Sequence, residues 1–407
     1  QGGFERAPDG VLPEVQISSS CVAAADYDRD GDVDLFVGGR LLAGRFPHAP
    51  SSTMLRNDGG RFVDVTDEVA PQCRALGMVS GACWSDLDDD GFVDLVVAAQ
   101  WQPVRVLGND GGGRFVDRTR AMGLEDVRGI WNGVISTDLD QDGDFDLVVT
   151  NIGLNTKYAA SPDKPMEIFA RDFDGNGTMD VVEAKRSGGL TLPVRGLSCS
   201  SQAMPFVREK FPTFDQFARA TIGDIYGVQL DECLKLSCNE LRHMWLENEG
   251  GAFRPRALLR RAQLSTGFGV LAVTEGIHRT SLQVAHNFFS PEPETGRTDG
   301  GLGVMMTYIG GACVTVEPLD ARFGDHRGLL RYRDPEGAAC VVHVRNDDRH
   351  SCATSAAPAA SSDLLQVRLE GAVGNPTGIG AKLTWRGESG HVRVREVAAG
   401  DGYLTQS

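Results

Sequence analysis

Aspartates recur in one spacing, D-x-D-x-[DN]-G-x-x-D, at four places in the first half of the chain. In such a loop, the side chains at positions one, three, five and nine can converge on one cation, and the backbone carbonyl of position seven can supply another oxygen. Hard oxygen ligands in this number select calcium. The expected ligands are Asp26, Asp28, Asp30, Asp32 and Asp34; Asp86, Asp88, Asp90, Phe92 and Asp94; Asp138, Asp140, Asp142, Asp144 and Asp146; and Asp172, Asp174, Asn176, Thr178 and Asp180.

A glycine follows position five in every copy, at Gly31, Gly91, Gly143 and Gly177. Glycine permits the sharp turn that brings position nine back to the ion. Two carboxylates held about 4 Å apart repel by about 4 kcal/mol at an effective dielectric constant of about 20. A loop with several carboxylates is therefore strained without a cation, and we expect about three to four calcium ions that stabilise the fold.

Three other interpretations of these loops fit less well. An EF-hand loop needs a bidentate Glu at position twelve between two helices, whereas here position nine is always Asp and apolar runs typical of strands follow. A solvated acidic turn would not explain the same spacing four times. The residues Asn176-Gly177-Thr178 match a glycosylation sequon, but Asn176 occupies a ligand position within its loop.

The segments around the loops predict strands. Each loop leads into a short apolar run rich in β-branched residues, such as Leu95-Val-Val97, which favours a buried strand. A second repeated element, Leu-x-Asn with Gly-Gly before Phe, begins at Leu55, Leu107 and Leu246 and favours a hairpin. The first three loops start about 50 to 60 residues apart, a spacing typical of propeller blades. We therefore predict an all-β fold, a β-propeller in which radial four-stranded sheets protect their own edges.

The pattern changes along the chain. The Phe-rich stretch at about 200–227 predicts a helical insertion between strands. Around 274–281 the strand pattern persists without the carboxylates, so a sheet there is expected to lack calcium. The Ser/Ala/Pro-rich residues 351–363 predict a linker or a surface loop. This segment separates the expected propeller, residues 1–350, from a small β-rich module at 364–407.

Composition excludes several classes of partner. The 56 acidic and 40 basic residues give a formal charge of −16, which disfavours nucleic acid and anionic membranes. No apolar run reaches the length of a membrane span, and we expect any signal peptide or anchor to lie outside this chain. The nine cysteines lack the CxxC spacing of a zinc site. They either pair, with Cys233 and Cys238 the closest candidates, or stay reduced as small apolar side chains.

The acidic loops and their Phe-Gly hairpins resemble the FG-GAP/VCBS repeats of integrin-α-like propellers. The end of the chain resembles the ASPIC/UnbV motif, in Asn375-Pro-Thr-Gly378-Ile-Gly380-Ala381, Arg395-Glu396-Val397 and Gly400-Asp-Gly402-Tyr403-Leu-Thr-Gln406-Ser407. Bacterial members of that group share segments similar to Gly38-Gly39-Arg40, Gly77-Met78-Val79, Phe211-Pro212-Thr213 and Glu294-Thr295-Gly296-Arg297. The resemblance implies a seven-bladed propeller with calcium in the loops, followed by a module similar to that of cartilage acidic proteins. That module usually continues further, so the chain is expected to stop short or to have been trimmed.

The resemblance implies two kinds of function. Members are mostly secreted or at the cell surface, where they act as binding modules for a protein, glycan or small-molecule partner, and calcium stiffens the loops that present the partner surface. The UnbV name comes from actinobacterial enediyne gene clusters, which implies the alternative of a calcium-dependent protein of natural-product biosynthesis, such as a cyclase that uses the propeller funnel. Candidate ligand-binding residues, each of which could equally have a structural role, are Arg40, Arg45, Trp101, Trp131, Asn132, Asn151, Asn155 and Tyr158.

Overall fold

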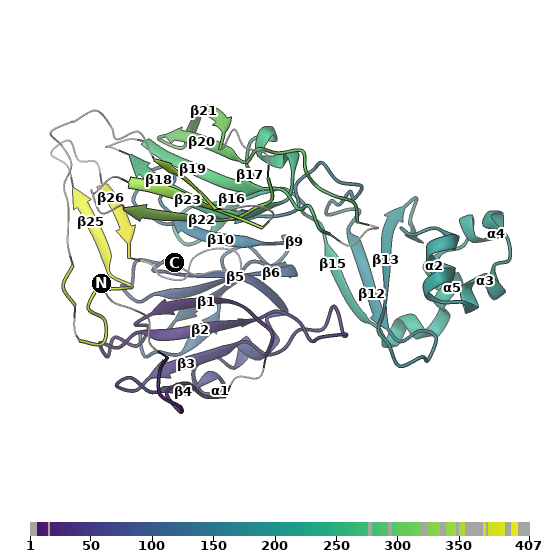
Figure 1. Cartoon of the computed structure of the whole chain (residues 1–407), viewed down its shortest axis with the longest axis horizontal. Helices are drawn as coiled ribbons and strands as arrows, with labels where there is room; N and C mark the ends of the chain where they lie inside the picture. The colour runs from purple at the N-terminus through teal and green to yellow at the C-terminus, as the bar shows by residue number, and fades with distance from the viewer. Residues whose placement is uncertain are drawn as a thin grey trace.

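A computed structural model gives the fold of the chain and describes residues 6–14, 17–275, 279–291, 295–319, 324–333, 339–346, 350–354, 369–371, 373–386 and 392–397. Strands hold 43% of the described residues and helices 12%, so the described part of the chain is mostly β, as predicted. All paired strands in the named sheets are antiparallel, and Figure 1 shows their arrangement. Within the described ranges, every helix is too short or too polar to cross a membrane.

The first two sheets each follow the chain order of their strands from the inside outward. A short helix α1 (Thr66–Val69) and a 3-10 turn η1 (Pro71–Ala75) connect them. The first sheet contains β1 (Ser19–Ala25), β2 (Asp34–Gly39), β3 (Thr53–Asn57) and β4 (Phe62–Asp64). The second contains β5 (Met78–Ser85), β6 (Asp94–Pro103), β7 (Arg105–Asn109) and β8 (Phe115–Asp117), and β9 (Arg128–Ile130) pairs with the far end of β6.

The third sheet is built from two separate stretches of chain. Its strands are β10 (Gly133–Thr137), β11 (Asp146–Thr150), β16 (Met244–Asn248) and β17 (Phe253–Ala257). Because β11 pairs with β16, residues 151–243 form an insertion between two neighbouring strands of one sheet. The Phe-rich helices expected at about 200–227 are present, but they are only one part of this longer insertion.

The insertion has its own sheet and its own core, and in Figure 1 it projects from one end of the molecule. Thr213 and Thr221 form capping boxes with Gln216 and Asp224, which begin two of its helices. An aromatic pair joins a helix to the loop at residues 172–179, with the ring centroids of Phe173 and Tyr226 4.6 Å apart. The elements are β12 (Met166–Arg171), β13 (Asp180–Ser187), β14 (Leu190–Pro193), α2 (Leu197–Ala203), α3 (Phe206–Lys210), α4 (Phe214–Ala218), α5 (Ile222–Tyr226), η2 (Gly227–Glu232) and β15 (Leu234–Cys238).

Two more sheets and a hairpin follow the third sheet. After η3 (Arg260–Leu264), the fourth sheet contains β18 (Gly267–Glu275), β19 (Arg279–His286), β20 (Val304–Ile309) and β21 (Ala312–Pro318). The fifth contains β22 (His326–Arg333), β23 (Ala339–Arg345) and β24 (Ser351–Thr354), so the start of the expected linker is a strand. The hairpin pairs β25 (Lys382–Arg386) with β26 (Val392–Glu396). Most of the expected linker lies outside the described residues.

The first strands of the five sheets pack side by side in the order β1, β5, β10, β18 and β22, which makes the array propeller-like. Glycines allow this close approach of backbones. A Cβ on Gly133 would lie 2.7 Å from the carbonyl oxygen of Phe268, and a Cβ on Gly269 would lie 2.8 Å from the Cα of Gly328. Apolar side chains fill the space between neighbouring sheets further out, as in the cluster of Tyr27 with Trp84.

Candidate metal sites in four acidic loops

Each of the four acidic loops joins two antiparallel neighbours: β1 to β2, β5 to β6, β10 to β11 and β12 to β13. We call them the first, second, third and fourth acidic loops. Position nine is in every case the first residue of the second strand, and it pairs across the ladder with the residue just before position one, as Asp34 does with Ala25. We call the five sheets whose first strands pack side by side the radial sheets. The first, second and third acidic loops therefore lie at equivalent ends of three radial sheets.

The four loops share one backbone conformation. The glycine at position six has a positive φ of 96°, 90°, 109° and 86° in the four loops, as the spacing predicted. Position four is also left-handed, with φ of 60° at Arg29, 58° at Asp89, 67° at Gln141 and 72° at Gly175. Sequence analysis did not single out position four. Non-glycine residues rarely adopt this conformation, so its recurrence indicates that the four loops share one specific shape.

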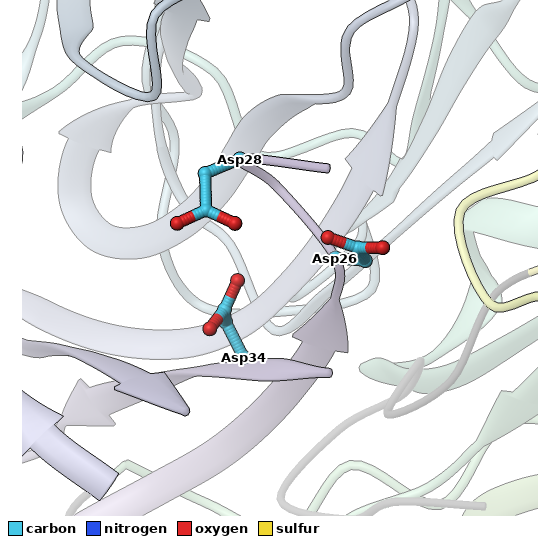
Figure 2. A group of neighbouring side chains, drawn as sticks. All are labelled: Asp26, Asp28 and Asp34. Atoms are coloured by element: carbon cyan, nitrogen blue, oxygen red, sulfur yellow. The ribbon is translucent and has the colours of Figure 1, made fainter. Parts of the chain in front are cut away.

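Carboxylates gather in all four loops. In each, one oxygen from each of three aspartates lies within 4.8 Å of the other two. Figure 2 shows the carboxyl groups of Asp26, Asp28 and Asp34 in the first loop around a common space. The other groups are Asp86, Asp88 and Asp90; Asp138, Asp140 and Asp142; and Asp172, Asp174 and Asp180. This is a set of hard oxygen donors of the kind that holds calcium.

The aspartate at position one has an unpartnered buried oxygen in three of the loops. Oδ1 of Asp26, Asp86 and Asp138 is buried without a hydrogen-bond donor. An unpartnered polar atom away from water is costly, and a bound cation would remove that cost. The fourth loop differs, because both oxygens of Asp172 accept backbone hydrogen bonds, from Asn176 at 3.1 Å and from Gly177 at 2.8 Å.

The pKa of the aspartate at position one is raised in the first three loops and lowered in the fourth. In the loops of the radial sheets, burial and neighbouring carboxylates outweigh hydrogen bonds and raise the pKa, because the charged form is desolvated. The values are about 8 for Asp34 and Asp146 and about 7 for Asp94 and Asp138. Backbone hydrogen bonds instead lower the pKa of Asp172 in the fourth loop. Asp172 is therefore stable as an anion without metal, although burial raises the pKa of Asp180 in the same loop.

Position nine braces its loop. Oδ2 of Asp146 accepts a hydrogen bond from the backbone N–H of Leu139 at 3.0 Å, and Oδ1 accepts one from the N–H of Asn248 at 2.8 Å. Asp34 and Asp94 make the equivalent pairs of bonds. These aspartates were predicted as ligands, and the described contacts give them a structural role as well.

The asparagine of the repeated hairpin connects neighbouring loops in two of its three copies, a role that sequence analysis missed. In the first copy, Asn57 donates to Val33 of its own loop. The side-chain amide of Asn109 donates to the carbonyl of Tyr27 in the first loop at 2.9 Å. Asn248 donates in the same way to the carbonyl of Leu87 in the second loop at 3.2 Å. Its threefold recurrence before Gly-Gly was the available signal, but it was interpreted only as turn chemistry. The three loops are thus tied into one layer.

Several of the eight candidate ligand-binding residues are buried and bonded to the protein itself. Trp131 is fully buried, and its indole N–H donates to the carbonyl of Gln102. The amides of Asn132 and Asn151 are also buried and donate to backbone carbonyls, those of Gly267 and Glu240.

The other five candidates are partly exposed or pack between elements. Trp101 and Tyr158 share an apolar cluster between β6 and the insertion, and the hydroxyl of Tyr158 donates to Glu183 at 2.6 Å. Arg40 donates to the carbonyl of Met78, and Asn155 donates to that of Leu264, whereas Arg45 lies exposed in a turn.

Two cavities, of about 320 and 190 Å³, lie beside the second sheet. Arg105, Asp117 and Arg128 line the larger one, and Met78 and Leu236 contribute to the smaller one. Neither includes any of the eight candidates. All nine cysteines have free thiols in the structure, including Cys233 and Cys238.

A family profile matches one part of the chain. The profile of an FG-GAP-like repeat matches residues 86–149, which contain the second and third acidic loops, so the predicted resemblance is confirmed there. The ASPIC/UnbV resemblance stays a prediction. No curated protein matches the chain.

Two solved structures are similar at low level. One is a GH43_1 enzyme from Xanthomonas citri, with 13% identity over 81% of this chain and 82% of that chain, and a TM-score of 0.30. The other is the BP39L lectin from Burkholderia pseudomallei, with 10% identity over 96% of this chain and 99% of that chain, and a TM-score of 0.30. At these scores neither likeness carries an argument about function.

Proposed function

We propose that this chain is a calcium-dependent β-propeller that acts as an extracellular binding module. The observation that carries the calcium assignment is the unpartnered buried oxygen of Asp26, Asp86 and Asp138, each in a loop where three carboxylates lie together. A cation coordinated by these oxygens would neutralise charges that burial otherwise disfavours. Three ions are assigned to the radial sheets, and the fourth loop is assigned a weaker site because Asp172 is already satisfied by backbone N–H groups.

The propeller itself rests on the radial packing of the inner strands and on the FG-GAP-like repeat at 86–149. Seven blades, as the resemblance implies, would require two more sheets than the five whose first strands pack side by side in the described residues. We therefore propose a propeller in which these five sheets are blades.

An extracellular location suits these sites. Calcium sites of extracellular modules commonly work at about 10⁻⁴ to 10⁻³ M, a concentration that the cytosol does not reach. The resemblance to secreted and cell-surface propellers supports the same location. The partner would be a protein, a glycan or a small molecule, held on a surface that calcium stiffens.

The alternative, a biosynthetic protein with a reactive funnel, needs polar groups that are free to act on a substrate. Trp131, Asn132 and Asn151 are instead buried and bonded to backbone carbonyls. The contacts of these three residues therefore favour the binding module.

Calcium titration by calorimetry, combined with thermal melts in calcium and in chelator, tests the proposal. We expect about three ions to bind and the melting temperature to rise with calcium, because a ligand that binds only the folded state stabilises it. Magnesium should give a much smaller rise, since it demands a tighter octahedral geometry. A chain that binds no calcium and melts alike in both buffers would disprove the assignment.

A further inference from the structure

The C-terminal hairpin lies over the acidic loops of the radial sheets. Figure 1 places β25 and β26 at the opposite end of the molecule from the insertion. Gly374, ahead of β25, approaches the first loop so closely that an added Cβ would collide with Oδ1 of Asp32. The side chain of Val392 lies 3.6 Å from the place that a Cβ on Gly143 of the third loop would take.

The hairpin forms ion pairs and a hydrogen bond with the second loop. Nζ of Lys382 lies 3.2 Å from Oδ2 of Asp86 and 2.8 Å from Oδ1 of Asp89. Oε1 of Glu396, in the opposite strand of the hairpin, accepts a hydrogen bond from the backbone N–H of Asp86 at 2.6 Å. Only 18% of the Lys382 side chain is exposed, and its ammonium lies 5.2 Å from the centre of the Phe145 ring.

This arrangement sets the second loop apart from the first and third. Lys382 pairs with Asp86 at position one, and Arg118 pairs with Asp88 at position three. In the part of the chain that the structure describes, no lysine or arginine forms an ion pair with an aspartate of the first or third loop. The second loop therefore already has protein cations beside two of its three clustered carboxylates.

A calcium ion in the second loop would share Asp86 with the ammonium of Lys382. Oδ1 of Asp86 is buried and unpartnered, so an oxygen remains for the ion. The ion and the ammonium, however, would be like charges within a few ångströms in a half-buried place, where repulsion is poorly screened. Each cation should therefore weaken the binding of the other.

We propose that Lys382 and calcium compete for the second acidic loop, so that hairpin docking lowers the calcium affinity of this loop and calcium loosens the hairpin. The inference rests on the proposed calcium function of the loops. Because binding free energies are linked reciprocally, both effects must have the same size. Docking of the hairpin on the second acidic loop would then depend on the calcium concentration.

The test compares Lys382→Met with Lys185→Met, which removes the same charge from the exposed end of β13 in the insertion. Both are made in wild type and in a background with Asp26→Asn, Asp138→Asn and Asp172→Asn, which leaves the second loop as the one intact site. Calorimetry should show that Lys382→Met tightens calcium binding at this site by about tenfold, within the usual range of coupling between sites. Lys185→Met should change it by less than about twofold.

Deuterium exchange of the unsubstituted chain supplies a second readout, which does not depend on how well the multiple variant folds. Peptides covering 382–386 and 392–396 should exchange faster in calcium than in chelator. If wild type binds calcium but Lys382→Met changes no affinity, or if calcium slows exchange in the hairpin, the competition is overturned while the calcium function stands. If wild type binds no calcium at all, both proposals fall.

Discussion

Position one of each radial acidic loop holds a carboxylate with a buried oxygen that lacks a hydrogen-bond partner. Oδ1 of Asp26 is buried without a partner, and burial raises the pKa of this residue. Asp26→Asn should lower the free energy of unfolding in saturating calcium by about 2.7 kcal/mol, the contribution of a ligand at 100 times its dissociation constant. In chelator the same change should raise stability slightly, because a neutral amide replaces a buried charge. Urea unfolding in the two buffers measures both effects.

Asp172→Asn is the matched control in the fourth loop. Its carboxylate is half-buried and accepts backbone hydrogen bonds from Asn176 and Gly177, so the part of its stability loss that depends on calcium should be smaller than for Asp26→Asn. An equal loss for Asp26→Asn in the two buffers would remove the reason to regard Asp26 as a ligand.

Two buried histidines give the fold an acid-sensitive point away from the loops. Nδ1 of His243 accepts a hydrogen bond from the N–H of Asn151 at 2.8 Å, so Nε2 carries the proton and donates to the carbonyl of Ser265. His286 stacks on His243, and neither of its ring nitrogens has a partner. Burial lowers the pKa of His243 to about 4 and that of His286 to about 3. The folded state therefore favours neutral imidazoles.

The sign of the pH effect follows from these shifts. Above pH 6.5, the usual histidine pKa, the folded and unfolded states are both neutral at these positions and stability is complete. As the pH falls from about 6.5 towards 4, the unfolded chain takes up protons that the folded chain refuses, and stability is lost. His286→Gln should reduce the loss between pH 7 and pH 5 by about 2 kcal/mol, at 1.36 kcal/mol per pKa unit. Parallel urea profiles for the two proteins would refute the assignment.

At the scale of elements, local repeats could be predicted and long-range ties could not. The spacing of the aspartates with their glycines identified four loops between strands, and each loop has the predicted turn at its glycine. The identity of the carbonyls that Asn109 and Asn248 reach depends on which sheets are neighbours, and no local pattern encodes this. Lys382 is further from Asp86 along the chain still, so its contact was also beyond sequence reasoning.

The hairpin asparagines should couple neighbouring sheets. Asn109→Ala or Asn248→Ala leaves a buried carbonyl of the preceding loop without its donor, which we expect to cost about 1 to 3 kcal/mol. Asn57→Ala is the control, because the amide of Asn57 donates to Val33 within its own loop. Calcium calorimetry should show that Asn109→Ala disturbs the first loop as well as the second, whereas Asn57→Ala disturbs the first alone. Loss confined to the mutated sheet in all three variants would show that the tie carries no coupling.

At the scale of the molecule, the insertion shows why the spacing of repeats is an incomplete guide to sheets. The fourth loop follows the third after about 34 residues, and a count of repeats alone would assign it to one more blade. The structure instead places it between β12 and β13 of the inserted sheet, while β11 pairs with β16 across 93 intervening residues, 151–243. A strand can pair with a partner far along the chain because the entropic cost of closing the intervening loop grows only slowly with its length.

The formal charge of −16 makes salt and calcium partly interchangeable in their effect on stability. Without calcium, clustered carboxylates repel, and raising NaCl from about 0.05 to 0.5 M shortens the screening length from over 10 Å to under 5 Å. The melting temperature of the chelated protein should therefore rise by several degrees, because salt weakens this repulsion. In a chain of this size, each 1 kcal/mol of added stability raises the melting temperature by about 2 °C or less. With calcium bound the gain should be much smaller, because the ions already neutralise the loops.

Sodium sulfate would confound the comparison, as it also strengthens apolar burial, so chloride is the salt to use. An equal gain in both buffers would mean that the repulsion is spread over the whole surface and not held in the acidic loops.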